Sequence, residues 1–258
     1  ALLGALWAAG RSAQELEDIA LALDKKSAFF NIIGIDDISI AHQGFFKGRQ
    51  VMRYLRGLLG TKTFEDLRCR LRVVATNLFT SEAVVFDEGD VADAVRASIS
   101  IPGIFRPHRI NGKVLIDGGV VDPLPVDVLA RQGVRKIIAV NVLSGPSDIM
   151  ERKEMVRRRA EKIAERVRLK GPIREWFYGL GKRLGRRYEA NIFNVIMNTI
   201  QFMEYSIAQT STQNADVVIH PVVADAQWME FYSARKFIEM GERKTREALA
   251  EIQKLVAE

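Results

Sequence analysis

One aspartate stands where a short apolar run meets two glycines. Residues 113–116 read KVLI, which is typical of a strand, and Asp117 follows them directly. An Asn-Gly pair at 111–112 precedes the run and favours a hairpin turn. Glycines after a strand let another backbone or a ligand approach closely. The pattern predicts a carboxylate at a strand end that could take a proton from a neighbouring group, although a structural turn also explains Asp-Gly-Gly taken alone.

The segments around Asp117 extend this pattern. Residues 97–105 read ASISIPGIF and residues 121–129 read VDPLPVDVL. Together with further segments they resemble the patatin-like phospholipase family, and the resemblance covers nearly the whole chain except the stretch near 146–195. The further segments are GFFKG at 44–48, KTFED at 62–66, VATN at 74–77, KIIAVN at 136–141 and GER at 241–243.

The resemblance implies a fold and a site. It implies a single domain over residues 1–258, with a three-layer α/β/α arrangement, a central mainly parallel sheet and a helical insertion. It also implies a Ser-Asp dyad in which Asp117 is the proton acceptor, supported by Gly118, Gly119 and Pro102. No metal or organic cofactor is implied.

The serine of the dyad is not found in the chain. The family carries it in a Gly-x-Ser-x-Gly motif, followed by an apolar helix similar to residues 1–10, ALLGALWAAG. The nearest match, Gly10-Arg-Ser-Ala-Gln14, fails at its last position, and Ser12 with Glu15 reads as a helix capping box. We therefore expect the nucleophile upstream of Ala1, and we expect the 258-residue chain alone to be inactive.

The implied reaction is the hydrolysis of phospholipids, lysophospholipids or similar acyl esters through a serine acyl-enzyme. A serine hydroxyl is a poor nucleophile until a base takes its proton, and a carboxylate can do so when burial raises its pKa. The alternative is a noncatalytic lipid-binding or regulatory module that keeps the fold. A Ser-His pairing through His108 is also conceivable, but we expect His108 in a partly exposed loop, and Ser98 and Ser100 in the turn before Pro102.

The basic residues are concentrated in one block. Residues 151–188 carry fourteen basic and five acidic side chains, a net charge of +9, whereas the whole chain has +6. We expect a helical basic insertion over 146–211 that covers an edge of the domain. It could dock on an anionic membrane surface, form a lid or be a solvated face; no nucleic-acid-binding pattern accompanies it. The interfacial candidates are Arg157, Arg158, Trp176, Phe177, Lys182 and Arg183.

Composition limits the remaining classes. One cysteine and three histidines provide neither a disulfide framework nor a zinc site at motif spacing. No apolar run is long enough to span a bilayer, so we expect a cytoplasmic protein whose membrane contact, if any, is peripheral. Oligomeric state is not indicated.

The expected elements alternate between strands and helices, which predicts an α/β fold. We expect a helix over 49–59 that ends at Gly60, a helix over 123–132 and one long C-terminal helix over 234–256. Strands are expected at 71–76, 83–86, 113–116, 136–142 and 216–220, and the first and the last two of these are apolar on both faces.

Overall fold

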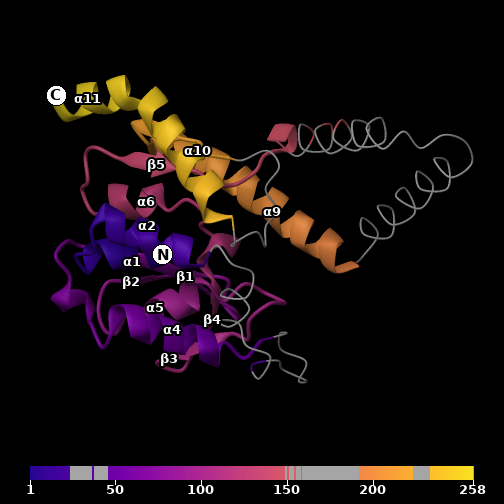
Figure 1. Cartoon of the computed structure of the whole chain (residues 1–258). Coiled ribbons are helices and arrows are strands. Elements are labelled where there is room, and N and C mark those ends of the chain that lie inside the picture. Colours follow the sequence, from indigo (N-terminus) through magenta and orange to yellow (C-terminus); the bar gives the residue numbers. More distant parts are fainter. Residues whose placement is uncertain are drawn as a thin grey trace, which may run out of the picture.

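The computed structural model describes residues 1–23, 37, 46–148, 150, 154, 158, 192–222 and 233–257. Helices and strands alternate along much of this part of the chain (Figure 1). The helices are α1 (Leu2–Ala8), α2 (Ala13–Ala22), α4 (Arg49–Leu59), α5 (Val91–Ser98), α6 (Val126–Ala130), α9 (Ile192–Ser211), α10 (Ala234–Glu247) and α11 (Leu249–Ala257). The strands are β1 (Val73–Asn77), β2 (Ala83–Phe86), β3 (His108–Ile110), β4 (Lys113–Asp117), β5 (Ile138–Val140) and β6 (Val217–Ile219). Short 3-10 helices lie at Phe64–Asp66 (η2), Gly118–Val120 (η3) and Thr212–Asn214 (η4).

The strands form two sheets. The larger has the order β2-β1-β4-β3 with antiparallel pairing throughout, and the smaller joins β5 and β6 in parallel. The predicted α/β class is confirmed. The expectation of mainly parallel strands holds for the β5–β6 pair, whereas the larger sheet is antiparallel because short turns join β1 to β2 and β3 to β4. At the β3–β4 turn, Asn111 and Gly112 have φ values of 48° and 76°, as a tight hairpin requires.

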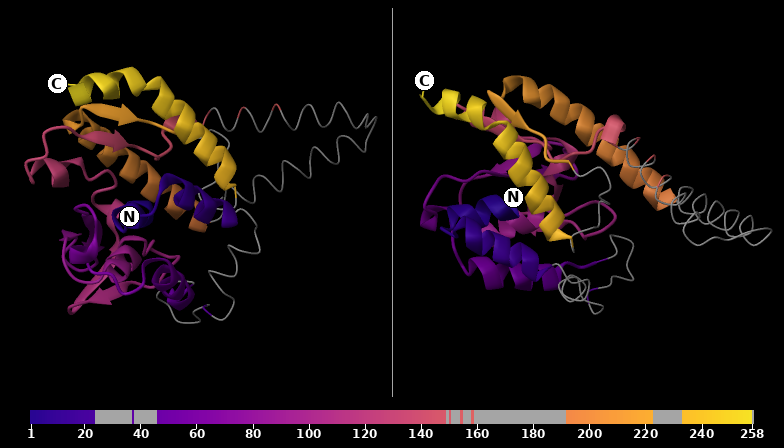
Figure 2. Two further views of the ribbon diagram at one scale, coloured as in Figure 1. Left: turned by 60° about the vertical axis from the view of Figure 1, so that its left-hand side comes forward. Right: turned by 45° about the horizontal axis from the view of Figure 1, so that its top comes forward.

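The core lies between the larger sheet and the helices near it. Leu6 of α1, Leu55 of α4 and Val95 of α5 are almost fully buried together with Val73 of β1. Helix α5 contacts β1 and β4 as well as α4, so it lies directly on the sheet. Burying these side chains places the end of β4 beside α1 and α5, where the site is built (Figure 2).

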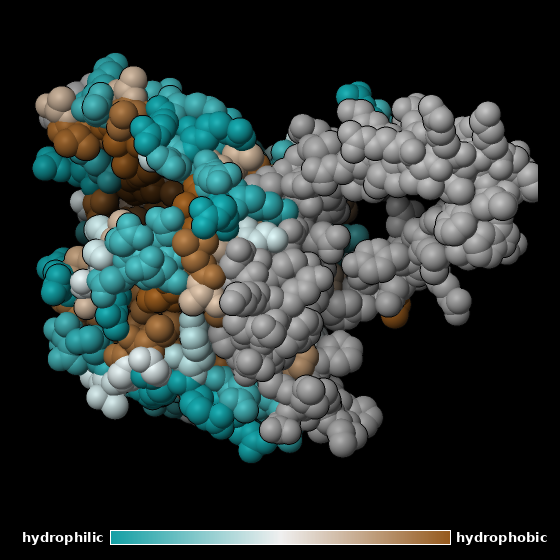
Figure 3. Space-filling view, in the orientation of Figure 1, coloured by the Kyte–Doolittle hydropathy of each residue, from teal (hydrophilic) through white to brown (hydrophobic). Residues whose placement is uncertain are grey.

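The smaller sheet keeps an exposed apolar face. Ala139 is buried, but Ile138, Val140 and Val218 are 42%, 51% and 40% exposed. The expectation that both faces of β5 and β6 are buried is therefore wrong for the described part of the chain. Figure 3 shows a recess lined with apolar side chains at the level of β5.

Local signals located the helix ends well. Helix α4 has the predicted bounds, with Gly60 as its C-cap, and Ser12 caps α2 in a complete capping box with Glu15. Helix α6 is shorter than predicted and begins after Pro125. The predicted C-terminal helix is two helices, which meet at Ala248, and Leu249 is 45% exposed rather than inward.

The basic insertion predicted over 146–211 lies largely outside the described residues, which include its last part as α9. Among the described residues, no helix is both long and apolar enough to cross a membrane.

Candidate active site

The backbone of Asp117 is fixed from two sides. Asp117 ends β4 and pairs with Ala75 of the adjacent strand β1. Its N–H donates to the carbonyl of Ser100 at 3.0 Å, and its own carbonyl accepts from the hydroxyl of Thr76 at 2.8 Å. Because Ser100 and Thr76 are both buried, these bonds hold the aspartate in place without using its carboxylate.

The two glycines have different tasks. A Cβ on Gly118 would lie 2.2 Å from the carbonyl oxygen of Val74, so only glycine fits where the chain leaves β4 across β1. Gly119 donates its N–H to Asp117 Oδ1 at 2.7 Å. Asp117 thereby caps η3, and its carboxylate takes one defined orientation.

The Asp117 carboxyl is a stronger base than an exposed aspartate. Burial raises its pKa to about 6, against the lowering effects of the Gly119 N–H and of the N-terminal ammonium of Ala1. A carboxyl with this pKa is mostly ionised at neutral pH and still binds a proton more readily than an ordinary aspartate. The effect of the ammonium also means that the carboxyl lies near the start of α1.

A second carboxyl, which the sequence analysis did not identify, belongs to Glu204 of α9. Glu204 Oε1 lies 3.2 Å from the position that a Cβ on Gly119 would take. Burial and the negative charge of Asp117 raise the pKa of Glu204 to about 7. The sequence does contain a signal, because Glu204 is the only charged residue in the twenty residues of α9. Two carboxyls with raised pKa values therefore lie on either side of Gly119.

The turn before β3 brings the ASISIPGIF segment to the same place. Ser100 follows α5, is fully buried, and exchanges hydrogen bonds through its hydroxyl with the carbonyl and the guanidinium of Arg96. The predicted support residue Pro102 lies in the turn that follows, with Gly103 at φ 81°. The structure thus places the serine in the turn, as expected, and uses its carbonyl to hold Asp117.

Two other residues have structural partners of their own. His108 is half-buried in β3 rather than in a partly exposed loop, and its Nε2 lies 3.1 Å from Asp93 Oδ1. Burial lowers the pKa of His108. Asn77 accepts the N–H of Phe79 at 3.1 Å and so shapes the turn from β1 to β2.

Most of the interfacial candidates are not placed. Arg158 forms an exposed ion pair with Glu154 at 3.2 Å, four residues earlier, as expected for a solvated helix face. Arg157, Trp176, Phe177, Lys182 and Arg183 lie outside the described residues. Among the residues that the structure does describe, no group of His, Cys, Asp and Glu side chains is arranged to hold a metal ion.

The geometry agrees with what known proteins show. The model of the patatin-like phospholipase family matches residues 1–130, which is half of the chain. The chain therefore belongs to the patatin-like phospholipase family, whose fold is a three-layer α/β/α arrangement.

Three relatives illustrate the similarity. An uncharacterised NTE family protein of Mycobacterium tuberculosis is 34% identical over 142 residues, which cover 55% of this chain and 38% of the relative. The lysophospholipase NTE1 of Meyerozyma guilliermondii is 31% identical over 116 residues, or 45% of this chain and 8% of the relative. A patatin-like phospholipase domain-containing protein of Caenorhabditis elegans is 30% identical over 148 residues, or 55% and 10%. The aligned regions thus span well under half the length of these relatives.

Proposed function

We propose that the protein is a lipid acyl hydrolase that cleaves carboxylic ester bonds of phospholipids, lysophospholipids or similar acyl esters. Membership in the patatin-like phospholipase family and similarity to a protein named a lysophospholipase support this reaction class. In the proposal, Asp117 is the proton acceptor of a serine acyl-enzyme mechanism. The domain is a single unit over 1–258, with residues 146–211 as a helical insertion.

One observation carries the assignment of Asp117. Its buried carboxyl lies close enough to Ala1 for the ammonium there to lower its pKa. The Gly-x-Ser-x-Gly motif does not occur in residues 1–258, so the proposal takes the serine from polypeptide that precedes Ala1. Residues joined to Ala1 would enter the site beside Asp117, where a hydroxyl could reach the carboxylate.

The proposed steps conserve every proton. The serine hydroxyl gives its proton to Asp117 as its oxygen attacks the ester carbonyl carbon. Collapse of the tetrahedral intermediate breaks the bond to the alcohol, which leaves with the proton from Asp117. Water then gives a proton to Asp117 as it attacks the acyl-enzyme, and the proton returns to the serine as the fatty acid departs.

The full-length gene product, assayed with a short-chain acyl ester, tests this proposal. We expect Asp117→Asn to lower kcat by about a hundredfold or more, the range that a positioned acid-base group contributes. Asp122→Asn is the matched control, because Asp122 is a neighbouring half-buried carboxyl whose pKa burial also raises. Unchanged turnover in Asp117→Asn would show that Asp117 is not the base.

A noncatalytic lipid-binding module is the competing candidate. The net charge of +9 in residues 151–188 favours it, because such a block is attracted to an anionic leaflet. Vesicle binding without ester hydrolysis by the full-length protein would support this candidate against the hydrolase.

A further inference from the structure

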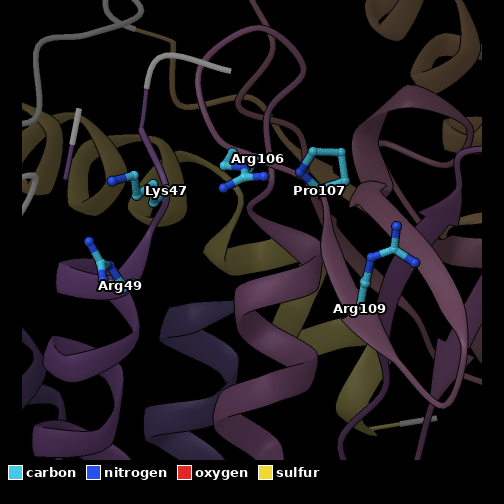
Figure 4. A pocket seen from close by; sticks show the side chains of 5 residues that line it. All are labelled: Lys47, Arg49, Arg106, Pro107 and Arg109. Atoms are coloured by element: carbon cyan, nitrogen blue, oxygen red, sulfur yellow. The ribbon is translucent and has the colours of Figure 1, made fainter. Parts of the chain in front are cut away.

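Four basic side chains surround an open pocket near the start of β3. Lys47, Arg49, Arg106 and Arg109 line it together with Pro107, and its volume is about 520 Å³. Figure 4 shows that Lys47 and Arg49 come from the segment that enters α4, whereas the other three come from the segment that enters β3. None of these five lining residues is acidic. We call this site the cationic pocket.

A buried arginine joins the two walls of the cationic pocket. Arg96 is 2% exposed, and its guanidinium donates to the carbonyls of Gly48 and Lys47, both at 3.3 Å, and of Arg106 at 3.4 Å. The same guanidinium lies 5.2 Å from the ring centre of Phe105. The pocket walls are therefore held by a side chain that does not itself line the pocket.

The backbone ties the same two segments together. Phe46 donates its N–H to the carbonyl of Ile104 at 2.9 Å and accepts the N–H of Arg106 at 2.9 Å. Gly48 has a φ of 80°, and a Cβ there would lie 1.8 Å from the Arg96 guanidinium. These contacts fix the origins of the basic side chains before any ligand binds.

The free amides at the start of α4 are already used. The buried carboxylate of Asp37 accepts the N–H of Gly48 at 2.6 Å and of Arg49 at 3.2 Å. Asp37 Oδ1 also lies 3.7 Å from Arg49 Nε, so it offsets part of one positive charge. The four side chains of the cationic pocket still carry excess positive charge, and they are the groups that would recognise an anion.

We propose that the cationic pocket binds a phosphate group. Cations held near one another repel, and a bound anion removes that repulsion. Guanidinium groups donate paired hydrogen bonds that match phosphate oxygens, and an ammonium adds a compact charge. A phosphate presents several oxygens, so it can contact cations from both walls at once.

The position of the cationic pocket relates it to Asp117. His108 pairs with Leu115, so Arg106 lies before β3 at the end of the hairpin where Asp117 ends β4. The phosphate could belong to a lipid head group or to a free phosphate ester. The binding itself requires no ester hydrolysis, so the proposal stands or falls separately from the role of Asp117.

Binding of inorganic phosphate, measured by calorimetry at low ionic strength, tests the proposal. We expect saturable binding by the wild type that weakens at least about tenfold in Arg49→Gln/Arg109→Gln, because two charge-assisted contacts are lost. The control Arg135→Gln/Lys136→Gln removes the same charge from exposed residues beside β5 and should change the affinity by less than about twofold. Asp117→Asn should bind phosphate as the wild type does.

Two outcomes would overturn the proposal. One is the absence of saturable phosphate binding by the wild type, and the other is equal weakening in the two double variants, which would show an effect of net charge alone. Amide NMR shifts on addition of phosphate to the wild type give a check that requires no variant. They should concentrate at residues 47–49 and 106–109, and shifts confined to other segments would contradict the assignment.

Vesicles distinguish the two phosphate sources. Phosphatidylcholine vesicles with and without phosphatidic acid are compared in sedimentation, with inorganic phosphate as competitor. If phosphate displaces the wild type, and the pocket variant alone loses binding, the ligand is a lipid phosphate. If phosphate binds in solution and leaves vesicle binding unchanged, the ligand is a free phosphate ester; both results support phosphate recognition.

Discussion

The Asp117 site and the cationic pocket are built from the same short segment but have opposite character. Ser100 holds the backbone of Asp117, and Arg96, one turn earlier, holds the backbone of Lys47 and Arg106. The Asp117 site is enclosed, and burial raises the pKa values of its two carboxyls. The cationic pocket is open, and its charges remain in contact with water.

The difference shows how burial assigns chemistry to charge. A carboxyl that loses water holds its proton more tightly and becomes a base suited to neutral pH. Arginine and lysine side chains that keep their water stay charged, and they can exchange that water for an anion. One segment therefore positions a proton acceptor on one side and an anion-binding surface on the other.

The largest expected effect comes from closing the space behind Asp117. In Gly118→Ala the new Cβ would meet the backbone of Val74, which cannot move aside as a side chain could. We expect the free energy of unfolding to fall by about 3 kcal/mol or more, measured by urea denaturation. Gly57→Ala is the control, because nothing lies within 4 Å of its Cβ position. A change below about 1 kcal/mol in Gly118→Ala would contradict the close approach described here.

Removing the arginine shared by the two sites should come next. Arg96→Met leaves the carbonyls of Lys47, Gly48 and Arg106 without their donor. We expect a loss of about 2 to 3 kcal/mol in the free energy of unfolding, together with weaker phosphate binding. Stable protein with unchanged phosphate affinity would separate the two sites and contradict their common support.

Stability should fall as the pH rises through the titration of the two buried carboxyls. The pKa values of Asp117 and Glu204 rise to about 6 and about 7 in the folded protein, from model values of 3.8 and 4.5. Between these limits the folded state binds more protons than the unfolded state, so their contribution is fully present below about pH 4 and is lost by about pH 7. We expect Asp117→Asn/Glu204→Gln to flatten the dependence by about 2 kcal/mol between pH 4 and pH 7.5. A dependence that stays as steep as in the wild type would show that other groups cause it.

The smallest expected effect is spectroscopic. Carbon NMR of the side-chain carboxyls should show coupled titration steps near pH 6 and pH 7 in the wild type. Glu204→Gln should leave one step, near 6, at Asp117. Two unchanged steps in this variant would exclude Glu204 as the partner.

Sequence signals located the parts that depend on neighbouring residues. The Ser12 capping box, the bounds of α4 and the end of β4 at Asp117 follow from residues within a few positions of each other. The requirement for Gly118 was predicted only as a general close approach. Its cause is a carbonyl on β1, which no pattern near residue 118 reveals.

Long-range contacts explain what the sequence did not predict. Glu204 reaches Gly119 from a helix that lies beyond the region matched by the family model. The cationic pocket joins residues 47–49 to residues 106–109 through Arg96. Each segment alone looks like an ordinary exposed stretch, so only the folded arrangement shows four basic side chains around one space.

The pH dependence of kcat/KM for ester hydrolysis by the full-length protein tests the central claim most directly. A base must be ionised to accept the serine proton, so kcat/KM should rise tenfold per pH unit at low pH and level off above the pKa of Asp117, about 6. An inflection near pH 4, or a rate that is flat from pH 5 to pH 7, would contradict a buried aspartate as the proton acceptor.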